Sequence, residues 1–354
     1  ALGALRQSIS GMSSHPQRDQ AFEAETQSGA WLHAGACTAR GPRPLNEDQH
    51  LLQCDWSSIP EWPAGLFAVF DGHGGAAVSV LAARMLAKSL WTEMQGQASS
   101  SESEPAWKSQ KGRRGAVERA FLGLDASLSI KSVANRAGCT CTAAIVWPSD
   151  LSGEAGDVAS DARSGSWQVL LANLGDSRGV VLRSEGTAIE VRAETVDHRP
   201  NLPEESRRII AAGGMVQKSP GPAETSPSRI DGDLSVSRAF GDFRFKGNFE
   251  LKAVEQKVSP LPDVYEMTCR ASDFVLLACD GVFDVMSSKE AGEIACGGLC
   301  RAGREDSKDE FGSGAASRSV VEAALAKHTF DNVTCVVLQA KGAPLLTGEA
   351  PVAG

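Results

Sequence analysis

Residues 66–75 constrain the fold of this chain more than any other stretch, because five apolar residues end abruptly at a carboxylate, a histidine and three glycines. A short apolar run that stops at such residues is typical of a buried strand rather than a helix. Asp71 and His73 are therefore expected just beyond a strand end, where the glycines let the backbone approach a ligand closely. A carboxylate in this position can hold a cation and still leave room for another ligand.

Two further stretches repeat this arrangement. The apolar run 274–279 ends at Asp280, and Asp331 precedes the apolar run 333–338. Because three acidic residues stand at strand ends, we expect them to share one site. Carboxylate oxygens are the ligands that Mg2+ and Mn2+ prefer, so the sequence predicts a site for hard divalent ions.

Three other acidic residues are weaker candidates. Glu47 and Asp48 are adjacent in the sequence, and adjacent side chains on a strand face opposite sides, so at most one of them points directly at a cation. An acidic turn is the simpler explanation of this pair. Asp176 lies in the segment 173–178, which we interpret as a turn between paired strands. It either makes that turn or contributes to the site.

Composition limits the kind of protein that carries this site. The chain has 354 residues, of which 42% are hydrophobic, enough for one large globular domain or two. Its net charge of -9 argues against a nucleic-acid-binding protein with a broad basic face. There is no apolar run of about 18 residues and no signal-like N-terminus, so we expect no membrane span and a cytoplasmic or nuclear location.

The cysteines point to the same compartment. Nine is an odd number, and several of them stand in apolar strands, which suits reduced and buried thiols in an intracellular protein. Cys296 and Cys300 could form half of a zinc site, but no second pair and no nearby histidine accompanies them.

The chain divides into a large domain and two tails. We expect an N-terminal tail over residues 1–28, one domain over 29–340, and a C-terminal tail over 341–354. Three segments within the domain look like insertions, at 96–115, 150–166 and 301–316. Apolar residues recur at helical spacing in three places, 78–86, 117–128 and 320–328, and predict helices that cover a sheet.

Seven motifs, taken in order, resemble those of the metal-dependent protein serine/threonine phosphatases, the type 2C class. They are Arg43-x-x-Asn46-Glu47-Asp48, Phe70-Asp71-Gly72-His73-Gly74-Gly75, Ala172-Asn173-Leu174-Gly175-Asp176-Ser177-Arg178, Asp197-His198-x-Pro200, Gly232-x-Leu234-x-Val236-Ser237-Arg238-Ala239-Phe240-Gly241-Asp242, Cys279-Asp280-Gly281-x-x-Asp284 and Asp331-Asn332-Val333-Thr334. The resemblance is specific because the motifs keep their order from about residue 30 to about residue 340. It implies an α+β fold, with a central sandwich of two antiparallel sheets flanked by helices and a pair of Mn2+ or Mg2+ ions at one end.

The resemblance also implies a set of metal ligands. Asp71 would bridge the two ions. The Gly72 carbonyl and Glu47 would serve one ion, partly through water, while Asp280 and Asp331 would serve the other. We count Asp48 with these ligands. Asp176 and Asp284 resemble the partners of a weaker third ion.

The catalytic roles follow from the same resemblance. Two ions can lower the pKa of a water molecule and present it to phosphorus, so the nucleophile would be water. Arg43 is matched to the arginine that binds the phosphoryl group, and His73 to the acid that protonates the leaving seryl or threonyl oxygen. The substrates would be phosphoproteins, and we expect a monomer.

Three alternatives can be compared with the same residues. Cys37 and Arg43 have the Cys-x5-Arg spacing of cysteine-nucleophile phosphatases, but the flanking histidine and glycine are missing. Residues 231–235 resemble an aspartyl-nucleophile motif, but a polar segment precedes them where that motif needs a buried strand. A catalytically inactive module on the same scaffold would have lost metal carboxylates, whereas Glu47, Asp71 and Asp280 are present. Asp331 is present as well, although Phe330 precedes it where relatives commonly carry a polar residue.

Overall fold

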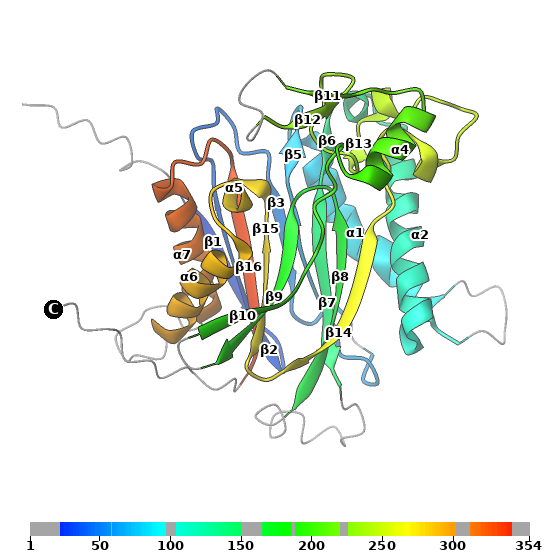
Figure 1. Ribbon diagram of the computed structural model, residues 1–354. Helices are drawn as coiled ribbons and strands as arrows, with labels where there is room; N and C mark the ends of the chain where they lie inside the picture. The colour runs from blue at the N-terminus through cyan, green and yellow to red at the C-terminus, as the bar shows by residue number, and fades with distance from the viewer. Residues whose placement is uncertain are drawn as a thin grey trace, which may run out of the picture.

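Two antiparallel sheets lie face to face at the centre of the protein, and helices cover their outer surfaces (Figure 1). The computed structural model describes residues 22–57, 59–96, 104–149, 165–185, 188–219, 226–301 and 312–341. The four layers run helix, sheet, sheet, helix. The expected α+β sandwich is therefore confirmed.

The first sheet has six strands. In spatial order they are β1 (Phe22–Ser28), β2 (Leu32–Ala39), β16 (Val333–Ala340), β15 (Asp273–Ala278), β9 (Arg178–Glu185) and β10 (Ala188–Glu194). The second sheet has five strands. In spatial order they are β14 (Asp263–Arg270), β8 (Ser166–Leu174), β7 (Cys141–Pro148), β4 (Gly65–Phe70) and β3 (Gln49–Gln53).

Strands β4 and β15 are buried on both faces, because each sheet lies between helices and the other sheet. Along β4, Leu66, Ala68 and Phe70 pack toward the helices, whereas Phe67 and Val69 pack toward the other sheet. Side chains of β15 alternate in the same way between a helix-facing core and the core between the sheets. This double burial explains the uninterrupted apolar runs in the sequence.

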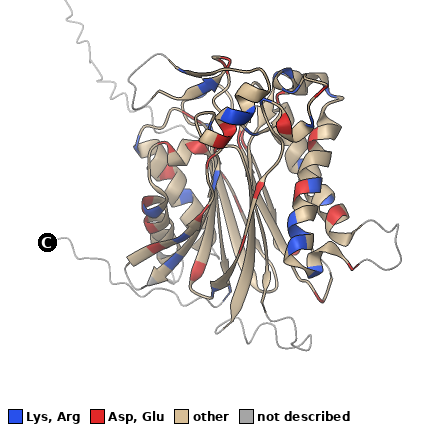
Figure 2. Ribbon diagram, turned by 45° about the vertical axis from the view of Figure 1, so that its right-hand side comes forward, with Lys and Arg blue, Asp and Glu red and all other residues tan. Residues whose placement is uncertain are grey.

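Two pairs of helices form the outer layers. Helices α1 (Ala77–Gln95) and α2 (Gln110–Leu128) cover the five-stranded sheet. Helices α6 (Ser288–Arg301) and α7 (Gly312–Ala326) cover the six-stranded sheet. Acidic and basic positions are mixed along these helices, whereas the strands carry few charges (Figure 2). Among the described elements, charged positions are therefore more frequent on the outer helices than on the strands between them (Figure 2).

Smaller elements gather at one end of the sandwich. A three-stranded sheet joins β13 (Phe240–Gly241), β6 (Gly138–Cys139) and β5 (Gly72–His73). Helix α4 (Pro203–Ala211) and the hairpin of β11 (Val216–Lys218) and β12 (Ser228–Ile230) share a core of their own. Helix α5 (Asp280–Phe283) is a single turn directly after β15. Short 3-10 turns occupy Ala106–Lys108, Ser132–Asn135, Phe243–Phe245 and Ala253–Glu255.

The expected N-terminal tail is too long by at least seven residues. Residues 22–28 form the edge strand β1, which pairs with β2 from Phe22 opposite Ala39 to Ser28 opposite His33. An edge strand exposes most of its side chains, so its sequence is polar and resembles a tail. Residues 1–21 and 342–354 lie outside the described residues.

Two expected insertions are shorter than predicted, because helices begin inside them. Helix α2 starts within 96–115, where the Ser109 side chain accepts a hydrogen bond from the Gly112 amide and caps the first turn. Helix α7 starts within 301–316. A Cβ on Gly35 of β2 would overlap the backbone of Gly314, so glycines at both positions let this helix lie directly on the sheet. Residues 97–103, 150–164 and 302–311 lie outside the described residues.

The interpretation of 173–178 as a turn between paired strands is wrong. Strand β8 belongs to the five-stranded sheet and β9 to the six-stranded sheet. The segment therefore crosses from one sheet to the other, and Gly175 turns the chain with a φ of 106°. Within the described part of the chain, no helix has the length and apolar character needed to cross a membrane.

Candidate metal centre

Four strands bring carboxylates to the same end of the sandwich. Asp71 follows β4 and Asp48 precedes β3, both in the five-stranded sheet. Asp280 closely follows β15 and Asp331 precedes β16, both in the six-stranded sheet. The cluster is therefore built from both halves of the sandwich.

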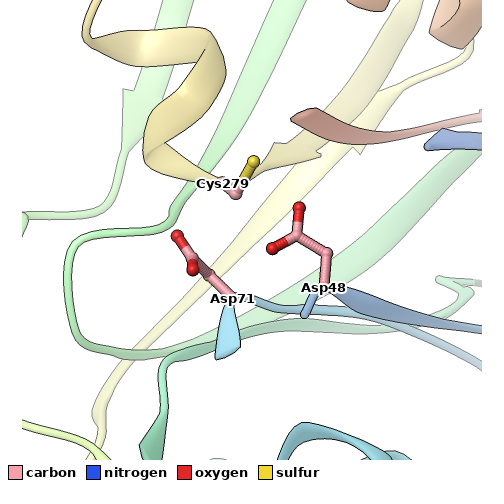
Figure 3. A group of neighbouring side chains, drawn as sticks. All are labelled: Asp48, Asp71 and Cys279. Carbon is pink, nitrogen blue, oxygen red and sulfur yellow. The ribbon is translucent and has the colours of Figure 1, made fainter. Parts of the chain in front are cut away.

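The most compact part of the cluster consists of Asp48, Asp71 and Cys279. One oxygen of each carboxylate and the sulfur of Cys279 all lie within 4.8 Å of one another. Figure 3 shows these three side chains gathered around one point. Among the described residues, no other group of three such side chains has this spacing.

A directional chain of hydrogen bonds orients Asp48. The Thr334 hydroxyl donates to Oδ2 of Asp48 over 2.6 Å. Its oxygen must therefore accept the hydrogen of Thr38, 2.7 Å away, and Thr38 in turn accepts from Nδ2 of Asn46 over 2.9 Å. The other oxygen, Oδ1, is buried and has no hydrogen-bond partner in the described structure. An orphaned buried carboxylate oxygen beside a second carboxylate fits a bound cation.

Burial, and after it the charge of neighbouring carboxylates, raises the pKa values of the clustered acids. Burial, together with neighbouring acidic charge, raises the pKa of Asp48 to about 7 and the pKa of Asp280 to about 7. Burial also raises the pKa of Asp71 well above its ordinary value, and the charges of Asp280 and Asp48 add to this. Neighbouring negative charges make each carboxyl group harder to deprotonate. A divalent ion bound between the carboxylates would reduce the same repulsion.

Asn332 fixes the loop that carries Glu47. Its side-chain amide donates to the carbonyls of Arg40 and Leu45, and its Oδ1 accepts from the Glu47 amide over 2.9 Å. A Cβ on Gly72 would overlap the Glu47 carbonyl oxygen, so only glycine permits this close approach. The Glu47 side chain lies outside the compact group of Asp48 and Asp71.

The residues expected to serve a weaker third ion lie around Asp280. Asp176 is buried in the crossing between the sheets, and its pKa is raised well above its ordinary value by burial and by the charge of Asp280. Asp284 is exposed just after α5. A guanidinium nitrogen of Arg199 lies 3.4 Å from Oδ1 of Asp284. The positive charge of this side chain also acts on Asp176.

Arg43, the expected phosphate-binding residue, contacts an expected metal ligand. Its Nη2 donates to Oδ2 of Asp331 over 2.6 Å, and its Nε donates to the Phe330 carbonyl over 2.9 Å. The side chain is half exposed. The guanidinium therefore stands at the edge of the carboxylate cluster, where it can meet a ligand from solvent.

His73 is paired with Asp242, a residue that we did not expect in the site. Its Nε2 lies 2.6 Å from Oδ2 of Asp242, which is fully buried. Burial lowers the pKa of the His73 ring, but the charge and hydrogen bond of Asp242 outweigh burial, so that the pKa is raised. The signal in the sequence was a carboxylate after Gly241, in a motif whose other residues are mostly small or apolar.

The small sheet explains why His73 and Asp242 meet. His73 of β5 lies opposite Gly138 of β6, and Gly138 lies opposite Gly241, the residue before Asp242. A Cβ on Gly138 would overlap Oδ2 of Asp242 and lie 2.6 Å from Nε2 of His73. Only glycine at position 138 leaves room for this contact.

The alternative nucleophiles are not placed for chemistry. Cys37 is buried in β2, and burial raises the pKa of its thiol to about 12. Asp231 accepts hydrogen bonds from Lys257 and from the Met215 amide and is not part of the cluster. Cys296 and Cys300 lie on α6, and no group of three metal-binding side chains in the described ranges includes them.

The chain is similar to known proteins along most of its length. A family model described as "Protein phosphatase 2C" matches residues 32–333. The chain is 34% identical to "Probable protein phosphatase 1N" of Homo sapiens over 341 residues, which cover 95% of this chain and 67% of that protein. It is 31% identical to "Protein phosphatase ppm-1.A" of Caenorhabditis elegans over 328 residues, which cover 89% of this chain and 61% of that protein. The chain thus spans roughly two thirds of the length of these relatives.

A solved structure shows the same likeness. The fold matches the crystal structure of a phosphatase from a pathogenic strain of Toxoplasma gondii with a TM-score of 0.68 and 27% sequence identity, over 90% of this chain and 96% of that chain. The range matched by the family model contains the whole carboxylate cluster as well as Arg43, His73 and Asp242. This chain therefore belongs to the protein phosphatase 2C family.

Proposed function

We propose that the chain hydrolyses phosphoserine and phosphothreonine in proteins, with a water molecule activated at a pair of Mg2+ or Mn2+ ions. The observation that carries this proposal is the cluster of carboxylates from four strand ends, in which a buried oxygen of Asp48 has no partner. Asp71, Asp280 and Asp331 are the proposed ligands beside it, with the Gly72 carbonyl and Glu47. Asp176 and Asp284 are proposed for a weaker third ion.

The ions, when bound, would lower the pKa of a water molecule and stabilise charge on the phosphoryl group. The protein would then supply binding and proton transfer. Arg43 can present its planar guanidinium to two phosphoryl oxygens once Asp331 binds an ion instead of Arg43. The contact between Arg43 and Asp331 supports this role, because it holds the guanidinium beside the cluster.

His73 is proposed to protonate the leaving oxygen of serine or threonine, which otherwise departs as a strongly basic alkoxide. His73 follows Asp71 by two residues, and the negative charges of Asp242 and Glu47 raise its pKa, which favours the protonated ring and supports this role. Asp242 would hold the ring in one orientation and would keep the proton-donating role for the other nitrogen, Nδ1.

We further propose phosphoprotein substrates, no nucleic-acid partner, a monomeric state and a cytoplasmic or nuclear location. The acidic balance of the chain supports the second of these. All nine cysteines are free thiols, seven of them buried, which is typical of a reducing compartment.

Metal dependence separates this proposal from an inactive module on the same scaffold. The purified chain is exhaustively treated with chelator and assayed on a phosphothreonine peptide, then assayed again with excess Mn2+ or Mg2+. We expect activity to vanish and to return. Turnover that persists without metal would contradict the ion-activated mechanism, and no turnover under any condition would favour a binding module.

A further inference from the structure

A buried ion pair lies beside the segment that carries Asp242 and has no place in the mechanism above. Nζ of Lys246 lies 2.9 Å from each carboxylate oxygen of Asp125, and the two side chains are 4% and 5% exposed. Asp125 belongs to α2, and Lys246 follows the 3-10 turn Phe243–Phe245. Because desolvation offsets most of the attraction in a buried pair, stability alone is a poor explanation for it.

Both members of the pair also bind the backbone around β13. Oδ1 of Asp125 accepts a hydrogen bond from the Gly241 amide over 2.8 Å. Nζ of Lys246 donates to the Ala239 carbonyl over 2.9 Å. The pair therefore holds the chain at the two residues that flank Phe240, directly before Asp242.

Asp242 depends on such support, because its backbone has a conformation that residues with a side chain rarely adopt. Its φ is 54°, and the φ of Gly241 is 77°. Strand β13 has two residues, so its own ladder supplies few hydrogen bonds. The direction of the Asp242 carboxylate, and with it the contact with His73, follows from where Gly241 is held.

We propose that Asp125 and Lys246 are positioning residues that hold Asp242 where its carboxylate meets His73. They act through the backbone of Gly241 and are not expected to touch substrate. The inference rests on the proposed function in one respect, since it concerns the group that orients the proposed proton donor. The contact between Asp242 and His73 is itself independent of hydrolysis, so it can also be tested without substrate.

A pair that served stability alone would behave differently. Its loss would lower the melting temperature and change the hydrolysis of all substrates by the same factor. Loss of a positioning pair should instead affect mainly substrates whose leaving oxygen needs a proton from His73. Its effect should also disappear when Asp242 can no longer orient the ring, because two changes in one chain of contacts are not additive.

The test variant combines Asp125→Leu with Lys246→Met, so that neither charge is left unpaired in the interior. The matched control combines Asp273→Leu with Arg183→Met. That pair is buried as well, with side chains 1% and 7% exposed and Nε of Arg183 2.6 Å from Oδ1 of Asp273. It stands at the start of β15, whereas Asp280 follows the end of that strand. Circular dichroism establishes that each variant is folded.

The kinetic measurement is kcat and KM on a phosphothreonine peptide and on para-nitrophenyl phosphate at saturating Mn2+. We expect the test variant to lose at least about tenfold on the peptide, mainly in kcat, and no more than about twofold on the aryl phosphate. The control variant should change both substrates by the same factor. Added to Asp242→Asn, the test substitutions should cost no more than about twofold on the peptide.

A conservative variant grades the effect. Asp125→Asn with Lys246→Met also removes both charges, but its amide oxygen can still accept the hydrogen bond from Gly241. It should recover part of the peptide activity that the test variant loses. It also preserves more of the native contacts, so it is measured in the same way if the test variant does not fold.

Nitrogen NMR of the histidine rings measures the contact without catalysis. The protein is labelled with 15N-histidine, and the His73 signals are identified by their absence from His73→Ala. We expect the Nε2 signal of His73 to shift in the test variant in the same direction as in Asp242→Asn. In the control variant it should stay in place.

An unchanged His73 signal in the folded test variant would overturn the positioning role. So would equal losses on the two substrates, or an undiminished loss in the Asp242→Asn background. If Mn2+-dependent hydrolysis persists while the signal does not shift, only the positioning role is refuted. If the signal shifts but the unmodified chain hydrolyses neither substrate, only the proposed function is refuted.

Discussion

Nε2 of His73 lies 2.6 Å from Oδ2 of Asp242, although 169 positions separate the two residues in the sequence. The carboxylate is completely buried and the histidine is partly exposed, so Asp242 approaches the ring from the protein interior. Asp242 engages one ring nitrogen, and a proton delivered to a substrate would have to come from the other. This contact fits the roles proposed above, with His73 as the proton donor and Asp242 as the group that orients its ring.

Asp242→Asn tests this orientation. The substitution keeps the shape of the side chain but removes the charge that favours the protonated ring. We expect kcat/KM on a phosphothreonine peptide to fall by roughly 10²-fold, and to fall much less on para-nitrophenyl phosphate, whose leaving group needs no proton. Asp233→Asn, an exposed aspartate nearby in the chain that pairs with Arg244, is the matched control. Equal losses on the two substrates would argue against an orienting role.

His73→Ala and Arg43→Ala should differ in their dependence on the leaving group. Loss of a general acid typically costs about 10²- to 10⁴-fold on a basic leaving group, so His73→Ala should cripple hydrolysis of phosphothreonine and spare much of the aryl phosphate rate. Arg43→Ala should weaken both alike, because the phosphoryl oxygens are common to both substrates. The measurement is kcat/KM for both substrates at saturating metal. A His73→Ala protein that loses both activities equally would leave His73 without the role of acid.

Gly138→Ala should disturb the same pair without altering either member. The new methyl group would overlap the Asp242 carboxylate and crowd Nε2 of His73. We expect at least about a tenfold loss on phosphothreonine, because a small misplacement of a catalytic group is costly. Gly123→Ala in α2 is the control, since nothing lies within 4 Å of a Cβ there. It should leave activity intact and stabilise the helix by about 0.5 to 1 kcal/mol. Full activity in Gly138→Ala would mean that the contact is dispensable.

Asp71→Asn and Asp280→Asn should bind metal more weakly but keep the fold. Each substitution removes one negative charge from the cluster, so we expect weaker Mn2+ binding in calorimetry and loss of most activity. Stability without metal should be kept or improved, because fewer carboxylates repel one another. An Asp280→Asn protein that binds Mn2+ like the unmodified chain and turns over normally would show that this residue is not a ligand.

The metal-free protein should become less stable as the pH rises. Asp48 and Asp280 have pKa values near 7 in the folded chain, raised from 3.8 by burial first and then by neighbouring acids. The folded state therefore binds these protons more tightly than the unfolded state. The tighter binding of these protons stabilises the folded state fully below about pH 4, and this stabilisation is lost as the pH rises through about 7.

Thermal unfolding in chelator at a series of pH values measures this effect. We expect the melting temperature to fall between about pH 5 and pH 8, and the fall to disappear with saturating Mn2+, because the ion then compensates the charges. Asp280→Asn should flatten the metal-free profile, whereas Asp233→Asn should not. A melting temperature that is constant or rises over this range would contradict the proposed crowding.

The strand ends that carry the cluster could be predicted because local pattern determines them. The apolar runs before Asp71 and Asp280 become β4 and β15, and their burial on both faces follows from the absence of any polar residue within the runs. Edge strand β1 was missed for the opposite reason, since it buries little and its polar sequence gives no periodic signal.

Pairing across the chain could not be predicted from local pattern. Two apolar strands joined by a short turn can form a hairpin, or they can belong to two different sheets, and their sequence fits both arrangements. Strands β8 and β9 belong to different sheets. The contacts of His73 with Asp242 and of Arg43 with Asp331 join residues more than 150 positions apart. The first contact depends on the pairing of three two-residue strands, and the second on the packing of two loops. No spacing of residues in the sequence predicts either arrangement.

The origin of the cluster in both sheets has a mechanical consequence. Asp48 and Asp71 belong to one sheet, and Asp280 and Asp331 to the other, so ions bound among them would join the two sheets at one end only. Any sliding of one sheet over the other would change the distances between ligands from opposite sheets. Helices α6 and α7 lie on the six-stranded sheet, so a displacement of these helices that moved that sheet would be expected to change the affinity for metal.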